Sequence, residues 1–495
     1  MDRIIFIINK YVIYTLILAF LIYIIIRAFT LSFTIDESAS YQYLQNLDLK
    51  NIFKKISANT HIINSIAMWF SGLIFGKSEL SLRLPNIVAS IFFLIYSYKT
   101  IKLIANKYIV VFFFLILVLN IFVFEFFSLA RGYGISLCFM MISIYFLLKY
   151  LVTNEGRNIK FIRNSLLFAG LSVFSNMIFL NFFLALLGVY IISFIFDYFV
   201  KKRIKSIKFD LCSTIIILVT LGINICLALY LNSKDAYYWG NYNGIDQDII
   251  KPLINVSFVI RNPGLRYETY ELIKNCARFI AYFTIFFSAL YFTVKSIKQK
   301  SIAYELLMLI LILTLLLSQF LQFKLLSIPL PIRRTAIIYI PLFSLILILL
   351  FNNLSSLKYK AISLFFKTIT FFIAFLVSVI FIRSMNLNKT TEWAAESDTK
   401  NSVYELINYD ENSQKSLNIT VFWIFHNTYN YYINKENLKW KCIRIDNVEK
   451  HSFLEPIEYF YLFEDNLKQI ESRGYKFNVI KKYPFTKTVL IKVFN

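Results

Sequence analysis

The chain has 495 residues, of which 58% are hydrophobic and only 16% are charged, and its formal net charge at pH 7 is +23. This apolar content exceeds what the core of a water-soluble protein needs, which excludes an ordinary soluble enzyme and indicates a chain solvated by lipid. The positive charge lies in short loops between apolar runs, where it sets membrane orientation, so we expect no nucleic-acid partner.

Apolar runs long enough to cross a hydrocarbon core of roughly 30 Å recur along most of the chain. The first run follows Arg3 and Lys10 and lacks a small-residue cleavage site, so we interpret it as a retained anchor and not a signal peptide. The pattern predicts an α-helical polytopic membrane protein with about eleven spans. The predicted spans are residues 11–31, 85–104, 107–125, 133–152, 161–179, 181–200, 211–231, 274–295, 302–323, 335–351 and 361–382.

Basic residues cluster in every second loop between these spans, as the positive-inside rule requires of cytoplasmic loops. The clusters are at 99–107, 149–163, 201–208, 295–300 and 358–367. We therefore predict a multi-pass protein of the plasma (inner) membrane with a cytoplasmic N-terminus and an extracytoplasmic C-terminus. The alternative is a chain with twelve spans and its C-terminal tail inside the cell.

The first outer loop, residues 32–84, contains two apolar segments that we do not count as spans. Residues 44–56 are amphipathic, and residues 61–76 are apolar but short for a crossing and carry Asn64 and Ser65. We predict that both are helices lying at the outer membrane interface. If residues 61–76 crossed instead, the parity of the basic loops would break.

The chain changes character at residue 386, where short apolar strands begin to alternate with polar helical patterns. We predict two domains, a membrane domain at 1–385 and a small extracytoplasmic α/β domain at 386–495. The five cysteines form no framework of regular spacings, so we expect no disulfide bonds. The sequence contains no glycine-rich phosphate loop of the Walker or dinucleotide type.

Polar residues gather on the predicted outer face, and charges beside lipid are functional candidates because they are costly there. Asp36 and Glu37 follow the first span. Adjacent carboxylates in an apolar setting repel each other, so one of the pair can have a raised pKa and act as a base. The alternative is a cap for a helix that begins at Ser38.

Two pairs of arginines lie on the same predicted face. Arg83 and Arg131 begin the second and fourth spans, and either an ion-pair lattice with the acidic pair or a phosphate site would use them, because guanidinium binds both anions. Arg333 and Arg334 follow a proline-broken loop, where they either anchor the chain at the interface or clamp an anionic lipid head group.

Two further features have alternative interpretations. The loop at 232–273, with Tyr237, Tyr238 and Trp239, is either an aromatic belt at the interface or a lid that stacks on sugars. His61 has no second ligand at metal-binding spacing, so we expect no resident metal and no other cofactor. A divalent ion shared by the acidic pair and a phosphate is the alternative.

Taken in order, these segments resemble one known plan. The matching pieces are Asp36-Glu37, His61, the run from Gly76 to Pro85 that contains Arg83, and Ala130-Arg131-Gly132-Tyr133, followed by PLPIRRTAIIYIPL at 329–342 and TTEWAAESDTK at 390–400. The set resembles the type C (GT-C) glycosyltransferases of the protein O-mannosyltransferase and aminoarabinose lipid A transferase group. One departure is that the family usually has His-Pro-Pro-Leu where this chain has His61-Ile62-Ile63-Asn64.

The resemblance implies an inverting enzyme that moves a sugar from a polyprenyl-phosphate donor to an acceptor, a lipid, glycan or protein, on the outer face of the membrane. Asp36 would be the catalytic base and Glu37 would orient it, through a transition state similar to that of glycosidases. The resemblance assigns substrate binding to the remaining polar residues, which are His61, Arg83, Arg131, Tyr133, Arg333 and Arg334. The abundance of Ile, Lys, Asn and Phe is typical of an A+T-rich, bacterial genome.

Three other functions use similar features. A flippase or transporter of lipid-linked glycans would need charged residues at span centres and pseudo-repeats, and neither is evident. A noncatalytic binder of the same lipid would not need the acidic pair. A surface-polysaccharide polymerase or ligase would have a large outer loop late in the chain, whereas the largest outer loops here are the first and the one at 232–273.

Overall fold

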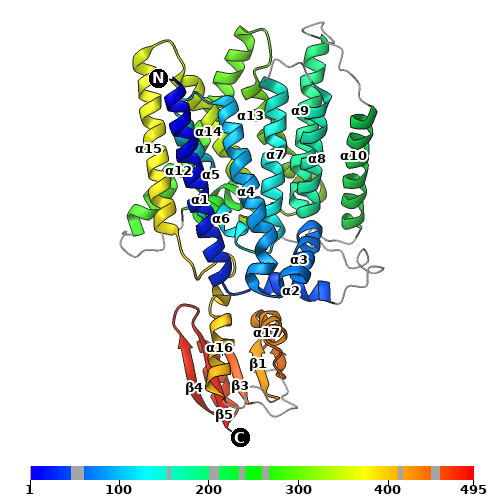
Figure 1. Cartoon of the computed structure of the whole chain (residues 1–495), viewed down its shortest axis with the longest axis vertical. Helices are drawn as coiled ribbons and strands as arrows, with labels where there is room; N and C mark the ends of the chain where they lie inside the picture. Colours follow the sequence, from blue (N-terminus) through cyan, green and yellow to red (C-terminus); the bar gives the residue numbers. More distant parts are fainter. Residues whose placement is uncertain are drawn as a thin grey trace.

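The computed structural model describes residues 2–45, 61–152, 158–199, 211–233, 240–258, 267–410, 416–447 and 458–494. The molecule is elongated: a bundle of long helices forms one end, and a small sheet domain forms the other (Figure 1). The N-terminus and the C-terminus are at opposite ends of the long axis. The chain is a multi-pass membrane protein by the length and apolarity of these helices.

Each predicted span coincides with a helix or with a bent pair of helices. Within the described residues, seven helices are long and apolar enough to cross a membrane, or eight if the bent pair is one span, so the count of eleven stays a prediction. The bundle helices are α1 (Asp2–Thr30), α4 (Glu79–Ile104), α5 (Val110–Val118), α6 (Ile121–Phe127), α7 (Gly132–Val152), α8 (Ile159–Ser175), α9 (Leu180–Phe199), α10 (Leu211–Asn232), α12 (Tyr267–Lys298), α13 (Tyr304–Leu326), α14 (Tyr339–Ser355) and α15 (Lys360–Ser384).

The bent pair is the predicted span at 107–125, which is not a straight helix. Helices α5 and α6 meet at an angle of 70°. Asn120 lies at the break, and its side chain accepts hydrogen bonds from the N–H groups of Phe122 and Val123 at 3.0 and 3.2 Å. A side chain that caps a new helix start in this way competes with continuation of the helix before it. The bend directs the chain after α6 toward Arg131 at the end of the bundle.

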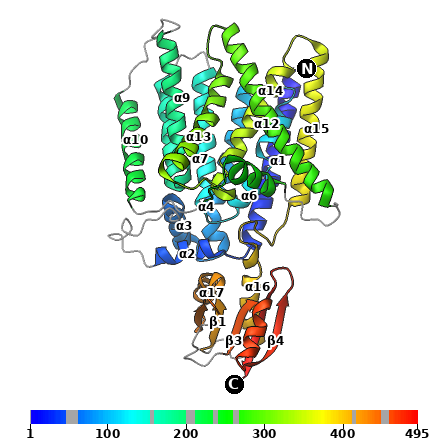
Figure 2. The ribbon, with the colours of Figure 1, turned by 180° about the vertical axis from the view of Figure 1, so that it is seen from behind.

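Helices α2 (Ile35–Gln45) and α3 (Ile62–Phe75) lie at the end of the bundle that faces the sheet domain (Figure 2). Helix α3 packs on α4 through a face that includes Asn64 and Met68, while Trp69, Leu73 and Ile74 are exposed. The predicted helix at 61–76 is therefore present, with an apolar face available to lipid. The amphipathic segment predicted at 44–56 lies almost wholly outside the described residues.

Basic side chains mark the opposite end of the bundle. Lys102, Lys149 and Lys295 lie in the last turns of α4, α7 and α12, and these helix ends point away from the sheet domain (Figure 1). The predicted basic loops thus share one end, as the parity argument requires. Which side of the membrane they face remains a prediction.

The C-terminal domain is a five-stranded sheet with helices, as the alternating pattern predicted. The strand order is β2-β1-β3-β5-β4, with β1 parallel to β2 and β3, and β5 antiparallel to β3 and β4. Helix α16 descends from the bundle alongside the sheet (Figure 1), and α17 packs against both α16 and α2. The elements are α16 (Thr399–Tyr409), β1 (Asn418–Phe422), α17 (Trp423–Lys435), β2 (Lys441–Ile445), β3 (Tyr459–Phe463), α18 (Leu467–Ser472), β4 (Lys476–Tyr483) and β5 (Thr488–Phe494).

The long loop before α12 is partly described. It contains a π-helical turn at Asp246–Ile250 and helix α11 (Lys251–Ser257). The aromatic residues Tyr237, Tyr238 and Trp239 lie outside the described residues, so the choice between a belt and a lid stays open.

Candidate active site

The candidate site lies where four segments meet between the bundle and the C-terminal domain. These are the start of α2, the turn before α7, the 3-10 turn at Arg333–Ala336 and the segment around Trp393 that leads to α16. They are far apart in sequence, and Asp36 joins three of them through its contacts.

Asp36 lies at the centre of the site in the first turn of α2. Its Oδ2 atom is 3.0 Å from Nη1 of Arg334 and 3.5 Å from Nη2 of Arg131. Nη1 of Arg131 also donates to the backbone carbonyl of Asp36 at 3.0 Å and to Oγ of Ser40 at 3.1 Å. The Asp36 side chain keeps 17% of its surface exposed, whereas Arg131 is fully buried. One of the two arginines predicted to face the acidic pair, Arg131, therefore contacts Asp36, and the contact of Asp36 with Arg334 was not predicted.

Glu37 has a different place, although it is the next residue. Its carboxylate accepts from the N–H of Thr34 at 2.9 Å, while the hydroxyl of Thr34 accepts from the N–H of Glu37 at 3.3 Å. This reciprocal pair is a capping box at the start of α2, which begins at Ile35 and not at Ser38. Oε1 also accepts from the N–H of Ala130 at 2.5 Å. Glu37 therefore fixes the start of α2 against the turn before α7.

Arg83 forms the other half of this buried unit. Its Nε and Nη2 atoms donate to the two oxygens of Glu37 at 2.8 and 2.7 Å, and both side chains are fully buried. Its remaining donors bind the backbone carbonyls of Ala28, Leu31 and Ser32, the last residues before α2. All five N–H donors of the guanidinium are thus used inside the protein. Arg83 positions the loop between α1 and α2, and the structure does not turn it toward the site.

His61 and Tyr133 form an aromatic wall. Their rings are 5.3 Å apart in an edge-on arrangement. His61 is 5% exposed, Nδ1 is 3.2 Å from the carbonyl of Ser175, and Nε2 has no hydrogen-bond partner among the residues that the structure describes. Burial lowers the pKa of the His61 imidazole well below its usual range, and the charges of Arg131 and Arg334 lower it further. The ring is therefore neutral, donates from Nδ1 and has a lone pair on Nε2.

Gly132 lets this wall form. A Cβ on Gly132 would lie 2.0 Å from the carbonyl of Ser175 and 2.8 Å from Cβ and Cγ of His61. Only glycine fits between the two segments, and its position sets the directions of Arg131 and Tyr133 on either side.

The two neighbouring arginines of the 3-10 turn differ. The Arg334 guanidinium lies between Asp36 and the ring of Trp393, 5.0 Å from the ring centroid, a distance typical of cation–π contact. Arg333 has an exposed side chain and a positive φ of 47°. The structure thus brings Arg334 into the site, and Arg333 remains available at its edge.

Two carboxyl groups that we did not predict lie beside these residues. Glu396 is 1% exposed, and its Oε2 accepts from the N–H of Ile35 at 2.5 Å. Burial raises the pKa of the Glu396 carboxyl well above its usual range, and the charges of Asp36 and Glu37 add to the effect. Burial also raises the pKa of Glu392, against the opposing charges of Arg334 and Arg333. Both glutamates lie in the segment TTEWAAESDTK. Its resemblance to the corresponding family segment was the one signal in the sequence that could have identified them.

A second buried ion pair ties the first span to the segment before Trp393. Arg27 donates to Glu125 at 3.1 Å and to the carbonyls of Asn386 and Lys389 at 2.6 and 2.5 Å. Glu125 in turn accepts from the N–H and hydroxyl of Thr391 at 2.6 and 3.0 Å. The pair holds the chain that carries Glu392 and Trp393 against α1 and α6.

The site contains donors and acceptors for an anion but no set of metal ligands. In the part of the chain that the structure describes, no three His, Cys, Asp or Glu side chains gather as a metal site would require. The arginines, the neutral histidine and the partly exposed aspartate together suit an anionic ligand with a hydroxyl group beside it.

Comparison with known proteins supports the fold. No protein-family model matches the sequence, and no curated protein is significantly similar to it. The structure is similar to that of ArnT from Cupriavidus metallidurans in the apo state, with a TM-score of 0.54 and 8% identity over 97% of each chain. ArnT bound to undecaprenyl phosphate matches with a TM-score of 0.52 and 9% identity, again over 97% of each chain.

An oligosaccharyltransferase from Archaeoglobus fulgidus, tethered to an acceptor peptide, is a more distant match. Its TM-score is 0.44 at 12% identity, over 92% of this chain and 70% of that one. The ArnT match over almost the whole of both chains confirms the predicted fold class, an α-helical polytopic membrane protein with a small C-terminal α/β domain.

Proposed function

We propose that this chain, which has the fold of ArnT, is a membrane glycosyltransferase that moves a sugar from a polyprenyl-phosphate donor to an acceptor hydroxyl. The observation that carries the proposal is the position of Asp36, which is partly exposed and lies between two arginines at the junction of the bundle and the C-terminal domain. That one ArnT structure contains undecaprenyl phosphate supports this class of donor. The sugar is a hexose or pentose, and the acceptor is a lipid, glycan or protein.

Asp36 is the catalytic base in this proposal. The acceptor oxygen attacks the anomeric carbon, its proton passes to the Asp36 carboxylate, and the bond from that carbon to the phosphate oxygen breaks. The electron pair of that bond leaves with the lipid phosphate. A single displacement of this kind inverts the anomeric carbon. A general base contributes about 10²–10⁴-fold to such a step.

The arginines bind the donor phosphate. Guanidinium binds carboxylate and phosphate with the same geometry, so Arg334 can exchange Asp36 for the phosphate when the donor arrives. A carboxylate beside a cation is a weaker base. Asp36 would therefore become a stronger base only in the complex with the donor, when Arg334 has moved to the phosphate. Arg333, exposed at the edge of the site, would add charge as the phosphate leaves. Arg131 would keep Asp36 oriented throughout.

His61 and Tyr133 would contact the sugar or the acceptor. The Nε2 lone pair of the neutral His61 accepts a hydrogen bond from a hydroxyl, and the Tyr133 ring beside it closes the wall. Glu37 and Arg83 act only as positioning residues, because their polar atoms are used in holding the start of α2.

We further propose that the site faces the outside of the cytoplasmic membrane. The basic helix ends lie at the opposite end of the bundle, and the positive-inside rule assigns that end to the cytoplasm. The C-terminal domain and the acceptor would then be extracytoplasmic. We include no resident metal or cofactor in the reaction, so transfer should continue in a chelator such as EDTA.

The direct test is release of lipid phosphate by the purified full chain in detergent, with a short-chain polyprenyl-phosphate sugar as the donor and crude envelope lipid as the acceptor. Asp36→Asn should reduce release by about 10²–10⁴-fold while donor binding persists. The matched control is Asp446→Asn, which removes an exposed ion pair with Arg444 in the C-terminal domain and should leave release unchanged.

A second pair of variants tests the phosphate site. Arg333→Ala should weaken donor binding by roughly tenfold, since a charged hydrogen bond is lost. Arg383→Ala, an exposed arginine in the last turn of α15, should have no effect. Unchanged release by Asp36→Asn would remove the assignment of the base. Donor binding without release under any acceptor would instead indicate a noncatalytic binder of the same lipid.

A further inference from the structure

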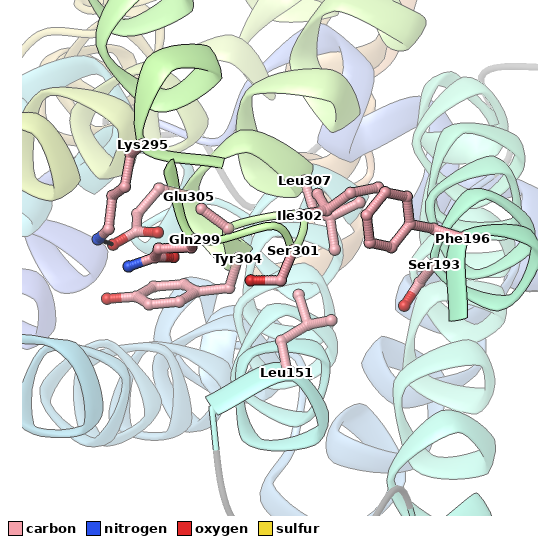
Figure 3. Close-up of a pocket in the computed structure, with 11 residues that line it drawn as sticks. Leu151, Ser193, Phe196, Lys295, Gln299, Ser301, Ile302, Tyr304, Glu305 and Leu307 are labelled. Carbon is pink, nitrogen blue, oxygen red and sulfur yellow. Dashed lines mark hydrogen bonds and ion pairs between the residues drawn. The ribbon is translucent and has the colours of Figure 1, made fainter. Parts of the chain in front are cut away.

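A cavity of about 270 Å³ lies at the end of the bundle opposite to the candidate active site (Figure 3). It lies between the end of α9, the last turn of α7 and the turn that joins α12 to α13, and it is partly open to the surface. Its polar lining comprises Ser193, Lys295, Gln299, Ser301, Tyr304 and Glu305. The volume is close to the lower end of the roughly 300–1,000 Å³ usual for small-molecule sites. It suits one compact group.

Glu305 is the least expected residue in this wall, because its side chain is only 1% exposed. Its Oε1 atom accepts from Nζ of Lys295 at 2.6 Å and from Nδ2 of Asn353 at 3.0 Å. Lys295 also donates to Oδ1 of Asn353 at 2.5 Å, so the three side chains form a closed triangle. Oε2 of Glu305 has no hydrogen-bond partner among the described residues. The Tyr304 hydroxyl also interacts with this carboxylate, and the Oε2 atom is itself inaccessible, so Glu305 contributes to the site by neutralising and holding Lys295.

The charge of the cavity restricts that ligand. Among the described residues that line it, Lys295 and Glu305 are the two charged ones, and they neutralise each other. An anionic ligand would compete with Glu305 for Lys295, and a cation would be repelled by the Lys295 ammonium. A neutral ligand with several hydroxyl groups avoids both conflicts. The hydroxyl and amide side chains of Ser301 and Gln299 can both donate to it and accept from it.

Aromatic side chains complete the site. Figure 3 shows the ring of Tyr304 beneath the Lys295–Glu305 pair and the ring of Phe196 on the opposite wall, toward α9. Aromatic faces beside polar groups suit the alternating apolar and hydroxylated surfaces of a sugar ring.

We propose that this cavity binds one neutral, hexose-sized polyhydroxyl group, either as a free sugar or as the head group of a glycolipid. The turn between α12 and α13 lies at the helix ends that the basic residues mark, so a glycolipid would place its head group there and its chains along the bundle. The site takes no part in the transfer reaction, and its occupancy does not depend on the proposed function.

The test uses the full chain in an amine-oxide detergent, because common detergents carry sugar head groups. Binding of short-chain monoglucosyl diacylglycerol, methyl β-glucoside and short-chain phosphatidylglycerol is measured by native mass spectrometry or calorimetry. The chain should bind a glucosyl probe more tightly than phosphatidylglycerol. Glu305→Gln, which removes the charge that holds Lys295 in the cavity wall, should weaken binding by roughly tenfold.

The matched control is Glu271→Gln, which changes an ion pair with Lys274 near the other end of α12 and should leave binding unchanged. Ser301→Ala, which keeps the charged triangle intact, should also weaken binding and serves if Glu305→Gln does not fold. Binding of methyl β-glucoside would show that a free sugar is sufficient. Binding of monoglucosyl diacylglycerol but not of methyl β-glucoside would show that the ligand is a glycolipid head group. No binding of either glucosyl probe, equal binding of phosphatidylglycerol, or equal losses in Glu271→Gln would overturn the proposal. Lipid-phosphate release is measured in parallel, so the two proposals fail separately.

Discussion

Asp36 and Glu37 are adjacent, yet the first turn of α2 gives their carboxylates different surroundings. Glu37 is fully buried and accepts hydrogen bonds from backbone and guanidinium donors on both oxygens. Asp36 faces two arginines and keeps contact with solvent. Two carboxylates in one motif thus divide into a positioning residue and a candidate base.

The buried pair of Glu37 and Arg83 yields a prediction for stability. Glu37→Gln leaves the Arg83 guanidinium buried without its counter-ion, which costs about 3–5 kcal/mol when one partner of a buried ion pair is lost. We expect a clearly lower Tm by differential scanning fluorimetry. Glu436→Gln, which changes a half-buried pair with Lys435, is the control and should shift Tm little. Equal Tm values for the two variants would contradict a stabilising role for the Glu37–Arg83 ion pair.

Glu396 yields a prediction for pH dependence. Its pKa is raised in the folded state, so between the unfolded pKa near 4.5 and the higher folded pKa the native state holds a proton that the unfolded state has lost. Stability therefore falls as pH rises through that range. Glu396→Gln keeps an acceptor for the N–H of Ile35 without any ionisation. Its Tm should exceed that of the wild type at pH 8, and the gap should narrow toward pH 4.5. A gap that widens on acidification would reverse the argument.

At the scale of single residues, the sequence could identify candidate site residues wherever a charged side chain stands beside the membrane. Asp36, Arg131 and Arg334 were predicted as site residues because charged side chains beside lipid are energetically costly. The roles of Glu37 and Arg83 could not be separated from these, because the direction of each side chain depends on the start of α2. Glu396 was missed as a site residue because its contact with Ile35 spans 361 positions and has no local pattern.

At the scale of the elements, the turn before α7 has no room for a side chain at Gly132. Gly132→Ala would drive a Cβ into the Ser175 carbonyl and the His61 ring, so the turn must shift and move Arg131 with it. We expect lower lipid-phosphate release together with a lower Tm. The control is Gly222→Ala in α10, where an added Cβ meets nothing within 4 Å and helix propensity should improve slightly. Comparable release from the two variants would show that the turn is not critical.

Hydrophobic periodicity predicted the position of every bundle helix but not their breaks. The predicted span at 107–125 is bent at Asn120, and the one at 161–179 ends at Ser175 before Asn176. In both cases a single asparagine caps the next turn. A 20-residue hydropathy window averages over one polar residue, so it detects the span and not the cap. In the tail, strands and helices alternate as predicted, and the tail begins with α16, whose polar face dominates a short segment.

The whole molecule depends on the contact between the C-terminal domain and the first outer loop. Tyr432 is fully buried there, accepts from the N–H of Phe33 at 3.0 Å and donates to Glu79 at 3.2 Å. Glu79 also pairs with Lys400 and Lys435 at 2.9 Å each. The domain therefore holds the loop between α1 and α2, directly before Asp36, through charged and aromatic contacts.

Tyr432→Phe tests this coupling with the loss of one oxygen atom. The buried N–H of Phe33 would be left without a partner, which costs about 1–3 kcal/mol. We expect a lower Tm and reduced release, because the loop before α2 loosens. Tyr409→Phe, which removes a hydroxyl from a side chain that is 46% exposed, should change neither. Reduced release without any change in Tm would instead point to a direct role for the tyrosine hydroxyl.

The distances along the chain have a consequence for biosynthesis. Asp36 leaves the ribosome early, but Arg334 follows it by 298 residues, and the Asn386 and Lys389 carbonyls that receive Arg27 come later still. During most of translation, Arg27 and Asp36 therefore lack these late partners, and the newly inserted bundle cannot close around them. A chaperone or insertase that shields the first loop until the ribosome releases the tail would act at the step where the molecule is most vulnerable to degradation.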